Sequence, residues 1–511
     1  MPVFGSIIKG AIELRGKVPS RMRNGNPYKA QKRTLKKLLR KAQLTAFGEN
    51  FRFSELLREK DTVKAFQQEV PIYDYNSIFK NWWYRALNGE PYVCWPGKIK
   101  YFALSSGTSE ASSKYIPVTS DMLKAIQKTS VRQIFSLGQY DFPHEFYEKS
   151  MLMLGGSTHL QYNGTYYEGD LSGITAGGLP FWFQHYYKPG KRISKERDWQ
   201  TKLDEIVKKA PDWDIGIIVG VPSWLQILLE KIIETHKLKT IHDIWPNLSI
   251  FVHGGVAFTP YAKGFEKLLA RPLTYMETYL ASEGFIAFQN RPNTTSMQLV
   301  LNNGIFFEFV PFNNTNFDDT GNIKPNPQVF SINDVEEGKE YALLLSSCAG
   351  AWRYQIGDTI KFTSKEHSEI IITGRTKHFL SICGEHLSVE NLNRAIHMLE
   401  EEFNIEVREF AVCGMTHKSM FAHKWYLGID KGFDAQLAAR KIDDYLKLLN
   451  DDYRVERLEA IRDVFAEVMH SCHFYNWMRQ QGKEGGSHKF PRVLSKEKSE
   501  LWEEFLKQKC N

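Results

Sequence analysis

The sequence predicts an α/β fold, with a large N-terminal α/β domain of mostly parallel sheets and a barrel-like part, and a small C-terminal α+β domain. Strand-like and helix-like segments alternate in the middle of the chain, which is typical of parallel sheets. After about residue 300 strands follow one another through turns, and the pattern changes again near Gly374. The 511 residues exceed one ordinary domain, and we predict a large domain over 1–376 and a small one over 377–511.

The first predicted element is a helical region between about residues 27 and 70, where apolar residues such as Leu38 and Leu39 recur at helical spacing. Basic residues crowd the first forty positions. One interpretation is an arm that binds phosphate or a membrane surface. We favour a solvated helix face, because the basic residues alternate with leucines.

The middle of the chain predicts βαβ units. Ser150 to Leu154 is a predicted strand that meets a Gly-Gly turn, and Trp213 to Val219 is apolar enough to be buried on both faces. A helix is predicted over Pro222 to Glu234, with proline in its first turn. Another strand, Ile250 to Val252, follows. These units predict a largely parallel sheet.

The second half of the chain predicts first a barrel-like part and then the small domain. The barrel-like part consists of strands over Gly304 to Val310, Tyr341 to Ser346 and Ile356 to Phe362. Helices beginning near Val389 and Asp434 belong to the small domain. Its predicted strands lie near 409–412 and 424–429.

Composition is that of a globular protein: 42% of the residues are hydrophobic and 24% are charged, with a net charge of +7. No run approaches the roughly 20 apolar residues that span a bilayer, and the N-terminus lacks a signal-peptide pattern. The cysteines form no CxxC pair, which favours a reducing cytoplasm over a zinc ribbon or a disulfide framework. They are Cys94, Cys348, Cys383, Cys413, Cys472 and Cys510.

The segment Leu104 to Lys114, LSSGTSEASSK, is a candidate phosphate-binding loop. It follows a predicted strand and places six hydroxyl side chains around Gly107 before a lysine. Small and hydroxyl-bearing residues let backbone N–H groups turn toward a polyphosphate. The Walker A pattern is absent, which argues against a P-loop NTPase. A plain surface turn is the alternative.

Two further segments place acids at predicted strand ends. In Tyr279 to Gly284, YLASEG, the aromatic residue could stack on a base, and Glu283 is a reasonable Mg²⁺ ligand. In Tyr354 to Asp358, YQIGD, the acid is suited to accept hydrogen bonds from ribose hydroxyls. A buried tyrosine, a surface acid and a simple Gly-Asp turn are the alternatives.

The remaining candidate segments lie at the predicted domain boundary and near the C-terminus. In Gly374 to Leu387, GRTKHFLSICGEHL, Arg375 can reach a nucleotide, and the linker could act as a hinge. In Gly482 to Arg492, GKEGGSHKFPR, a glycine-rich loop could deliver Lys489 to a reaction centre. An exposed basic loop is the alternative.

In this order and spacing, SSGTS, YLASEG, RYQIGD and GRTKHFLSICGE resemble the adenylate-forming superfamily of acyl-CoA synthetases and firefly luciferase. The sequence is more similar still to the auxin-responsive Gretchen Hagen family of acyl acid–amido synthetases. The start QKRTLKKLLRKAQLTAFGENFRF and the ending HKFPR contribute to this resemblance. It extends from about Leu35 to Arg492.

The resemblance implies ATP and Mg²⁺ as cofactors and a role for each motif residue. Glu283 would bind Mg²⁺, and Lys489 would bridge the acyl carboxylate and the α-phosphate. The residues implied to hold the rest of the nucleotide are Ser105, Ser106, Thr108 and Ser109 at the phosphates, Tyr279 at the adenine, Asp358 at the ribose, and Arg375 at ribose or phosphate. Two positions depart from the family pattern: Glu110-Ala111-Ser112 replaces glycine, and His378 stands where an aspartate is usual.

The sequence therefore predicts adenylation of a carboxylic acid followed by acyl transfer to an amine, and an amino acid is the expected acceptor. The absence of a nucleophile motif such as GxSxG fits a reaction without a covalent enzyme intermediate. Transfer to coenzyme A is one alternative, and a non-catalytic nucleotide-binding protein is another. Nucleic-acid and membrane binding are not expected. Gly155 to Gly178, with its aromatic residues, is either an acyl pocket or core.

Overall fold

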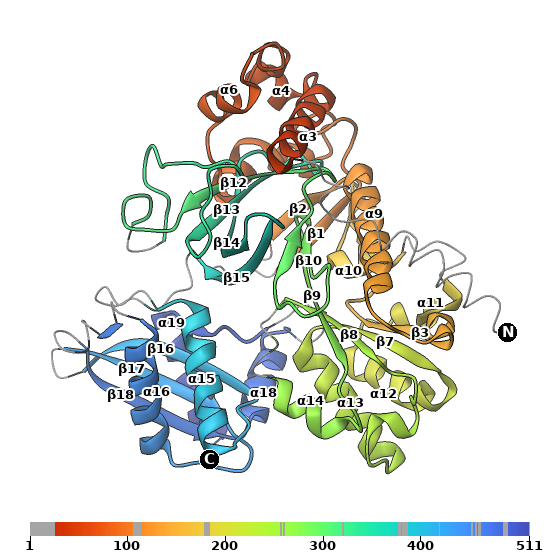
Figure 1. Cartoon of the computed structure of the whole chain (residues 1–511), viewed down its shortest axis with the longest axis vertical. Coiled ribbons are helices and arrows are strands. Elements are labelled where there is room, and N and C mark those ends of the chain that lie inside the picture. Colours follow the sequence, from red (N-terminus) through yellow and green to blue (C-terminus); the bar gives the residue numbers. More distant parts are fainter. Residues whose placement is uncertain are drawn as a thin grey trace.

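A computed structural model describes most residues of the chain. In Figure 1 a large sheet occupies the centre, helices of the N-terminal part lie at the top, and a separate sheet of the C-terminal part lies at the lower left. The described residues are 26–105, 114–177, 184–255, 258, 261–318, 321–376, 380, 387–417, 420–450, 453–454, 457, 461–483 and 489–509.

The central sheet has eleven strands among the described residues, in the order β12-β13-β14-β15-β11-β10-β9-β8-β7-β3-β6. From β9 to β6 every neighbouring pair is parallel. Apolar residues predominate in β3, β7 and β8, as the sequence predicts for strands covered on both faces. The parallel strands are β3 (Ser150–Leu154), β6 (Tyr187–Lys188), β7 (Ile215–Gly220), β8 (Ile250–Gly254) and β9 (Thr274–Ala281).

Three helices pack on one face of the parallel strands and share one core with them, in the lower right of Figure 1. Proline opens the second of these helices, α13, where its missing N–H group costs no helical hydrogen bond. These helices are α12 (Trp199–Lys209), α13 (Pro222–His236) and α14 (Ala262–Leu268). On the opposite face lie Met276, Ile250 and aromatic residues that follow helix α9 (Ser120–Ser136).

The other half of the central sheet is antiparallel, from β9 through β10 to β12. Its strands are β10 (Gly284–Phe288), β11 (Met297–Leu299), β12 (Ile305–Pro311), β13 (Glu340–Ser347), β14 (Tyr354–Ser364) and β15 (Glu369–Arg375). The N-terminal helices share the largest core with these strands. They include α3 (Pro27–Ala42), α4 (Ala46–Asn50), α5 (Phe53–Leu56), α6 (Thr62–Glu69), α7 (Tyr75–Ile78) and α8 (Tyr84–Leu87).

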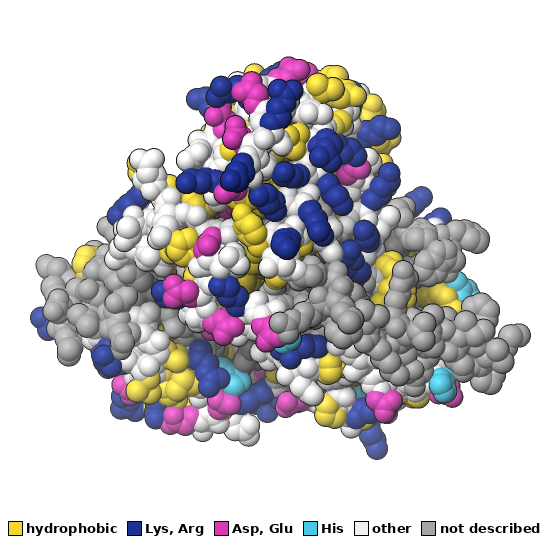
Figure 2. All heavy atoms as spheres, turned by 45° about the horizontal axis from the view of Figure 1, so that its top comes forward, with side chains coloured by type: hydrophobic (Ala, Val, Ile, Leu, Met, Phe, Trp, Pro, Cys, Tyr) yellow, Lys and Arg dark blue, Asp and Glu magenta, His cyan; other side chains and the backbone are white. Residues whose placement is uncertain are grey.

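Helix α3 buries Leu35, Leu38 and Leu39, so its basic residues lie on the opposite, solvated side. Figure 2 shows many Lys and Arg side chains over the part of the molecule where α3 and its neighbours lie. One side of α3 is buried and the other is solvated, which explains why basic residues alternate with leucines in this sequence. Within the described ranges, no helix combines the length and the apolar character needed to cross a membrane.

A second, smaller sheet has the order β2-β1-β5-β4 among the described residues. Strands β1 (Tyr101–Ser105) and β2 (Lys114–Val118) are antiparallel and pair Ser105 with Lys114. The predicted phosphate loop therefore connects two strands that end at the same edge. The remaining strands are β5 (Tyr167–Gly169) and β4 (Gln161–Tyr162), which α10 (Leu171–Gly177) follows.

The C-terminal part forms a four-stranded sheet of order β18-β17-β16-β19 among the described residues. Two helices cover one face of this sheet and bury a core of their own. The sheet consists of β16 (Glu409–His417), β17 (Met420–Gly428), β18 (Ile461–Met469) and β19 (Val493–Leu494), with helices α15 (Val389–Phe403) and α16 (Ala435–Leu449). Helices α18 (Cys472–Gln480) and α19 (Lys496–Lys509) join the core around α12 to α14 instead.

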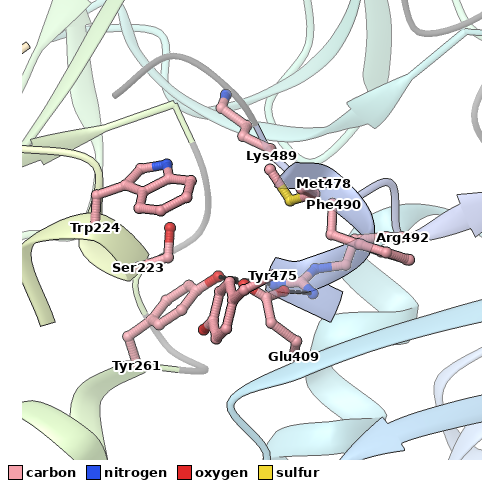
Figure 3. Close-up of a pocket in the computed structure, with 9 residues that line it drawn as sticks. All are labelled: Ser223, Trp224, Tyr261, Glu409, Tyr475, Met478, Lys489, Phe490 and Arg492. Atoms are coloured by element: carbon pink, nitrogen blue, oxygen red, sulfur yellow. Dashed lines mark hydrogen bonds and ion pairs between the residues drawn. The ribbon is translucent and has the colours of Figure 1, made fainter. Parts of the chain in front are cut away.

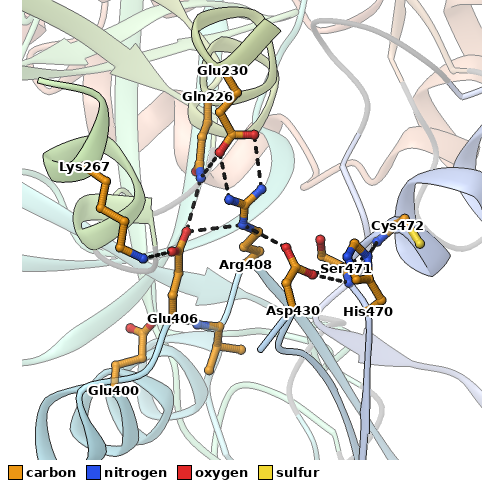
Figure 4. Close-up of polar contacts among 11 residues, drawn as sticks. Gln226, Glu230, Lys267, Glu400, Glu406, Arg408, Asp430, His470, Ser471 and Cys472 are labelled. Carbon is orange, nitrogen blue, oxygen red and sulfur yellow. Dashed lines mark hydrogen bonds and ion pairs between the residues drawn. The ribbon is translucent and has the colours of Figure 1, made fainter. Parts of the chain in front are cut away.

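Ion pairs connect the C-terminal sheet with helices α13 and α14 (Figure 4). Arg408 lies 2.8 Å from Glu230 of α13 and 3.2 Å from Asp430, and Glu406 pairs with Lys267 of α14. Apolar and charged contacts together hold the C-terminal part against the helices on the parallel strands in this structure.

The α/β class is confirmed, and so is a separate C-terminal unit. The strand–helix alternation predicted from the sequence corresponds to the parallel half of the central sheet, and the turn-linked strands after residue 300 correspond to the antiparallel half. The division into 1–376 and 377–511 stays a prediction, because most of the residues around it lie outside the described ranges.

Candidate active site

Tyr279 and Asp358 come from strands far apart in the sheet order, and their side chains meet. Tyr279 lies near the end of β9 and donates a hydrogen bond from its hydroxyl to a carboxylate oxygen of Asp358 in β14. Tyr279 is buried, and its pKa is raised well above its usual range by burial and by the charge of Asp358. The phenol therefore stays protonated and remains a donor.

Arg375 completes this cluster from the neighbouring strand. It pairs with Asp358 in the β14–β15 register, and its Nε lies 3.0 Å from Asp358 Oδ1. Its Nη2 also donates to the carbonyl oxygen of Ile356 at 3.1 Å. The Asp358 carboxylate raises the pKa of Arg375 further. Three predicted nucleotide-site residues thus form one hydrogen-bonded group.

Glu283 lies in the tight turn between β9 and β10, and its side chain is buried. Burial, with a smaller contribution from Asp358, raises the pKa of Glu283 to about 7. No hydrogen bond or ion pair of its carboxylate to another described side chain is observed. A buried carboxylate is unfavourable unless a cation or donors compensate it. Its environment therefore fits a divalent cation such as Mg²⁺.

Lys489 reaches the site from the C-terminal part. Its ammonium donates a hydrogen bond to the carbonyl oxygen of Gly255, which directly follows β8. The side chain is exposed, yet the surrounding protein withdraws the ammonium from bulk water and lowers its pKa to about 8. Repulsion by Arg375 adds to this effect, and attraction to Asp358 opposes it. Lys489 thus lies within electrostatic reach of the Asp358–Arg375 pair.

The ammonium of Lys489 contacts Gly255, and two observations favour glycine at this position. Its φ is +84°, a conformation that side chains disfavour. A Cβ atom would also lie only 2.9 Å from Nζ and 3.1 Å from Cε of Lys489. Nothing in the sequence pattern around His253-Gly254-Gly255 identifies this contact, because it depends on how the C-terminal part docks.

The phosphate-loop residues are only partly described. Ser105 is the last residue of β1, whereas Ser106, Thr108 and Ser109 lie outside the described residues. At the other end of the loop, Lys114 opens β2 and lowers the pKa of Glu283. Lys114, at the end of the loop, therefore lies within electrostatic reach of Glu283. His378 lies outside the described residues too, so the predicted hinge stays a prediction.

A small cavity adjoins Glu283 on the side of α9. Apolar side chains of α9 and of the antiparallel strands form most of its wall. The cavity is lined by Met122, Ala125, Ile126, Glu283, Gly284, Phe285, Asn303, Ile305, Ser347 and Cys348.

The tyrosines of Gly155 to Gly178 differ in their burial and do not line the cavity beside Glu283. Tyr166 is buried in the core against Phe102, at a ring distance of 4.8 Å. Tyr162 and Tyr167 are exposed. Tyr166 agrees with the alternative that these aromatic residues belong to the core, whereas Tyr162 and Tyr167 do not, and an acyl pocket in this segment stays a prediction.

The overall architecture is shared with adenylate-forming enzymes. A solved 2-hydroxyisobutyryl-CoA ligase in the postadenylation state superimposes with a TM-score of 0.61, covering 97% of this chain and 93% of that chain at 13% identity. A solved acyl acid amido synthetase, GH3.15, gives a TM-score of 0.76 and covers 95% and 94% of the two chains at 17% identity. The chain therefore shares the fold of these two solved ligases.

Sequence comparison identifies the family of the chain. Three family models match the chain: the GH3 family N-terminal domain over residues 22–204, the central domain over 298–372 and the C-terminal domain over 390–498. The protein belongs to the GH3 family, which confirms the resemblance stated from its motifs.

Among characterised relatives, an indole-3-acetic acid-amido synthetase from Arabidopsis thaliana, GH3.4, is 28% identical over 207 residues. That match covers 39% of this chain and 32% of the relative, so the chain spans about a third of the length of this relative. A jasmonoyl–L-amino acid synthetase from Nicotiana attenuata, JAR6, is 22% identical over 401 residues, which are 65% of this chain and 66% of the relative.

Proposed function

We propose that the protein is a ligase that uses ATP to adenylate a carboxylic acid and then transfers the acyl group to an amine, with an amino acid as the expected acceptor. The observation that carries this proposal is the meeting of Tyr279, Asp358 and Arg375 beside the buried Glu283, with Lys489 supplied by the C-terminal part. The names of the two GH3 relatives, an indole-3-acetic acid-amido synthetase and a jasmonoyl–L-amino acid synthetase, support the same reaction.

In the first step, an oxygen of the acid attacks the α-phosphorus of ATP, and the bond to the bridging oxygen breaks to release pyrophosphate. Lys489 would hold the acyl carboxylate against the α-phosphate, because its positive ammonium attracts both negatively charged groups. Tyr279 would pack on the adenine, and Asp358 would accept hydrogen bonds from the ribose hydroxyls. Ser105, Ser106, Thr108 and Ser109 would bind the phosphates with the loop's backbone N–H groups.

Glu283 would hold Mg²⁺, which neutralises negative charge on the phosphate oxygens during attack. Its burial supports this role, because a buried carboxylate requires a cation or donors to compensate it. Arg375 orients Asp358 through the 3.0 Å ion pair and directs its remaining donors toward ribose or phosphate.

In the second step, the amine nitrogen bonds to the acyl carbon, the bond from that carbon to the AMP oxygen breaks, and the nitrogen loses its proton. For this step the C-terminal part would turn and withdraw Lys489, so that the amine reaches the acyl carbon. The mobile small domain over 377–511 is part of this proposal. We also propose that the reaction takes place in the cytoplasm, in line with the unpaired cysteines among the described residues.

Transfer to coenzyme A is the second candidate, because a CoA ligase shares the fold and the adenylation step. The two functions differ only in the acceptor.

The test is pyrophosphate release from MgATP with a panel of carboxylic acids, each with no acceptor, with mixed amino acids or with coenzyme A. We expect release that depends on one acid and rises with amino acids, together with an amide product. A thioester product would support the CoA ligase. Folded protein that binds ATP but releases no pyrophosphate with any acid would support the non-catalytic alternative.

A further inference from the structure

The segment that carries Lys489 is fixed to the C-terminal part by the residue that follows it. Phe490 is buried, and its ring lies 4.7 Å from Phe474, 5.2 Å from Trp477 and 5.1 Å from Trp502. These rings belong to α18 and α19. The backbone next to Lys489 therefore moves only together with this aromatic cluster.

Arg492 fixes the same segment three residues further on. Its Nη1 lies 2.6 Å from Glu409 and donates to the carbonyl oxygen of Phe410 at 3.0 Å. The guanidinium also stacks on the Phe410 ring at 4.3 Å. Both charged side chains of the pair are nearly buried, with 11% and 5% of their surface exposed. Such a pair holds its geometry firmly, because separating it would strand a charge away from water.

One residue of the large α/β part reaches into this pair. Tyr261 lies at the start of α14, and its hydroxyl donates to Glu409 Oε1 at 3.0 Å. The hydroxyl oxygen of Tyr261 in turn accepts a hydrogen bond from Nη2 of Arg492 at 3.2 Å. Figure 3 shows the Tyr261 hydroxyl pointing at Arg492 and Glu409 across the cavity that Lys489 also lines.

We infer that Tyr261 is a positioning residue for Lys489: its hydroxyl recognises the Arg492–Glu409 pair and so holds the C-terminal part in the orientation that places Lys489 in the site. This inference rests on the proposed role of Lys489 in adenylation.

The contact has the properties that such a role requires. Tyr261 is 3% exposed, and burial together with the neighbouring Glu409 raises the pKa of its hydroxyl above the usual range, so the hydroxyl stays a donor. Arg492 and Glu409 hold each other without Tyr261. Removing only the hydroxyl therefore leaves the Lys489 segment intact and weakens one contact between the two parts of the chain.

The experiment compares the two half-reactions in Tyr261→Phe. Acid-dependent pyrophosphate release reports adenylation, and amide formation from a chemically prepared acyl-adenylate reports acyl transfer. Hydrogen bonds to charged groups are worth about 1.5–3 kcal/mol, which corresponds to a factor of about ten or more in a rate. We expect adenylation to fall by about tenfold or more and acyl transfer from the prepared adenylate to stay within about twofold of the parent.

A double variant separates positioning from general damage. If Tyr261 acts through Lys489, adding Tyr261→Phe to Lys489→Ala lowers adenylation no further, because the group being positioned is already absent. Tyr187→Phe is the matched control, since Tyr187 is also buried and its hydroxyl lies 2.9 Å from Ser194 within the large α/β part. It should leave the ratio of the two half-reactions unchanged.

Equal losses of both half-reactions in Tyr261→Phe, a parent-like adenylation rate, or a further loss in the double variant would each overturn the positioning role. Failure of the proposed function is distinguishable, because then the parent itself would release no pyrophosphate with any acid.

Discussion

Replacing Arg353 by methionine should strongly destabilise the protein, although Arg353 directly precedes a strand of the site. Its guanidinium lies 3.0 Å from Glu308 and donates to the carbonyl oxygens of Gln67 and Val70 at 2.7 Å each. The exposed fractions of the two charged side chains are 5% and 0%. The pair therefore lies in the core beneath β14 and joins this strand to β12 and to the end of α6.

The magnitude follows from what Arg353→Met leaves behind. Glu308 would remain fully buried with only the amide of Gln67, at 3.0 Å, as a donor. Breaking a buried pair by removing one partner costs about 3–5 kcal/mol. This is a large share of the roughly 5–15 kcal/mol by which proteins are stable. We therefore expect the free energy of unfolding to fall by about 3–5 kcal/mol.

Urea unfolding followed by circular dichroism measures this change. The double variant Arg353→Met/Glu308→Leu should lose less stability than the single variant, because no carboxylate is left buried. Lys209→Met is the control: Lys209 pairs with Asp212 at 3.3 Å with both side chains mostly exposed, and such pairs contribute about 0–1 kcal/mol. A loss of less than about 1 kcal/mol in Arg353→Met, or a larger loss in the double variant, would refute this reasoning.

Three further predictions concern the site. Since the pKa of Lys489 is lowered to about 8, adenylation should decline as the pH rises through about 8 and the ammonium loses its proton. In Lys489→Arg the positive charge persists, so the pH–rate profile should lose this decline. A variant profile that kept the decline would contradict the assignment. Gly255→Ala should slow pyrophosphate release by about tenfold or more but spare acyl transfer from prepared adenylate, because the new Cβ displaces the ammonium; unchanged release would argue against the contact. Calorimetry should show a much larger loss of ATP affinity in Asp358→Ala than in Tyr279→Phe, which keeps the ring for the adenine; the reverse order would exclude these roles.

Much of the fold could be predicted from local patterns. The apolar strand at β7, the proline that opens α13 and the turn-linked strands after residue 300 are local signals, and each corresponds to an element of the structure. The order of the motifs also identified the family. Three residues of these motifs, Tyr279, Asp358 and Arg375, are separated in sequence but meet in one group.

What could not be predicted depends on contacts between distant segments. Gly255 contacts Lys489, and Tyr261 contacts Arg492, only because the C-terminal part docks beside the end of β8 and the start of α14. Arg353 belongs by sequence to the site motif, yet its side chain serves the core. Residue spacing does not contain this information, because it relates residues that are close along the chain. Composition does not contain it either, because it carries no positions.

The most direct test of adenylation uses the acid found in the panel, labelled with ¹⁸O in its carboxylate, in a full reaction with MgATP and an amino acid. Attack of the carboxylate on the α-phosphorus predicts one ¹⁸O atom in the AMP and one in the amide carbonyl, both measured by mass spectrometry. Unlabelled AMP, or ADP accompanied by labelled phosphate, would contradict an acyl-adenylate intermediate and with it the proposed function.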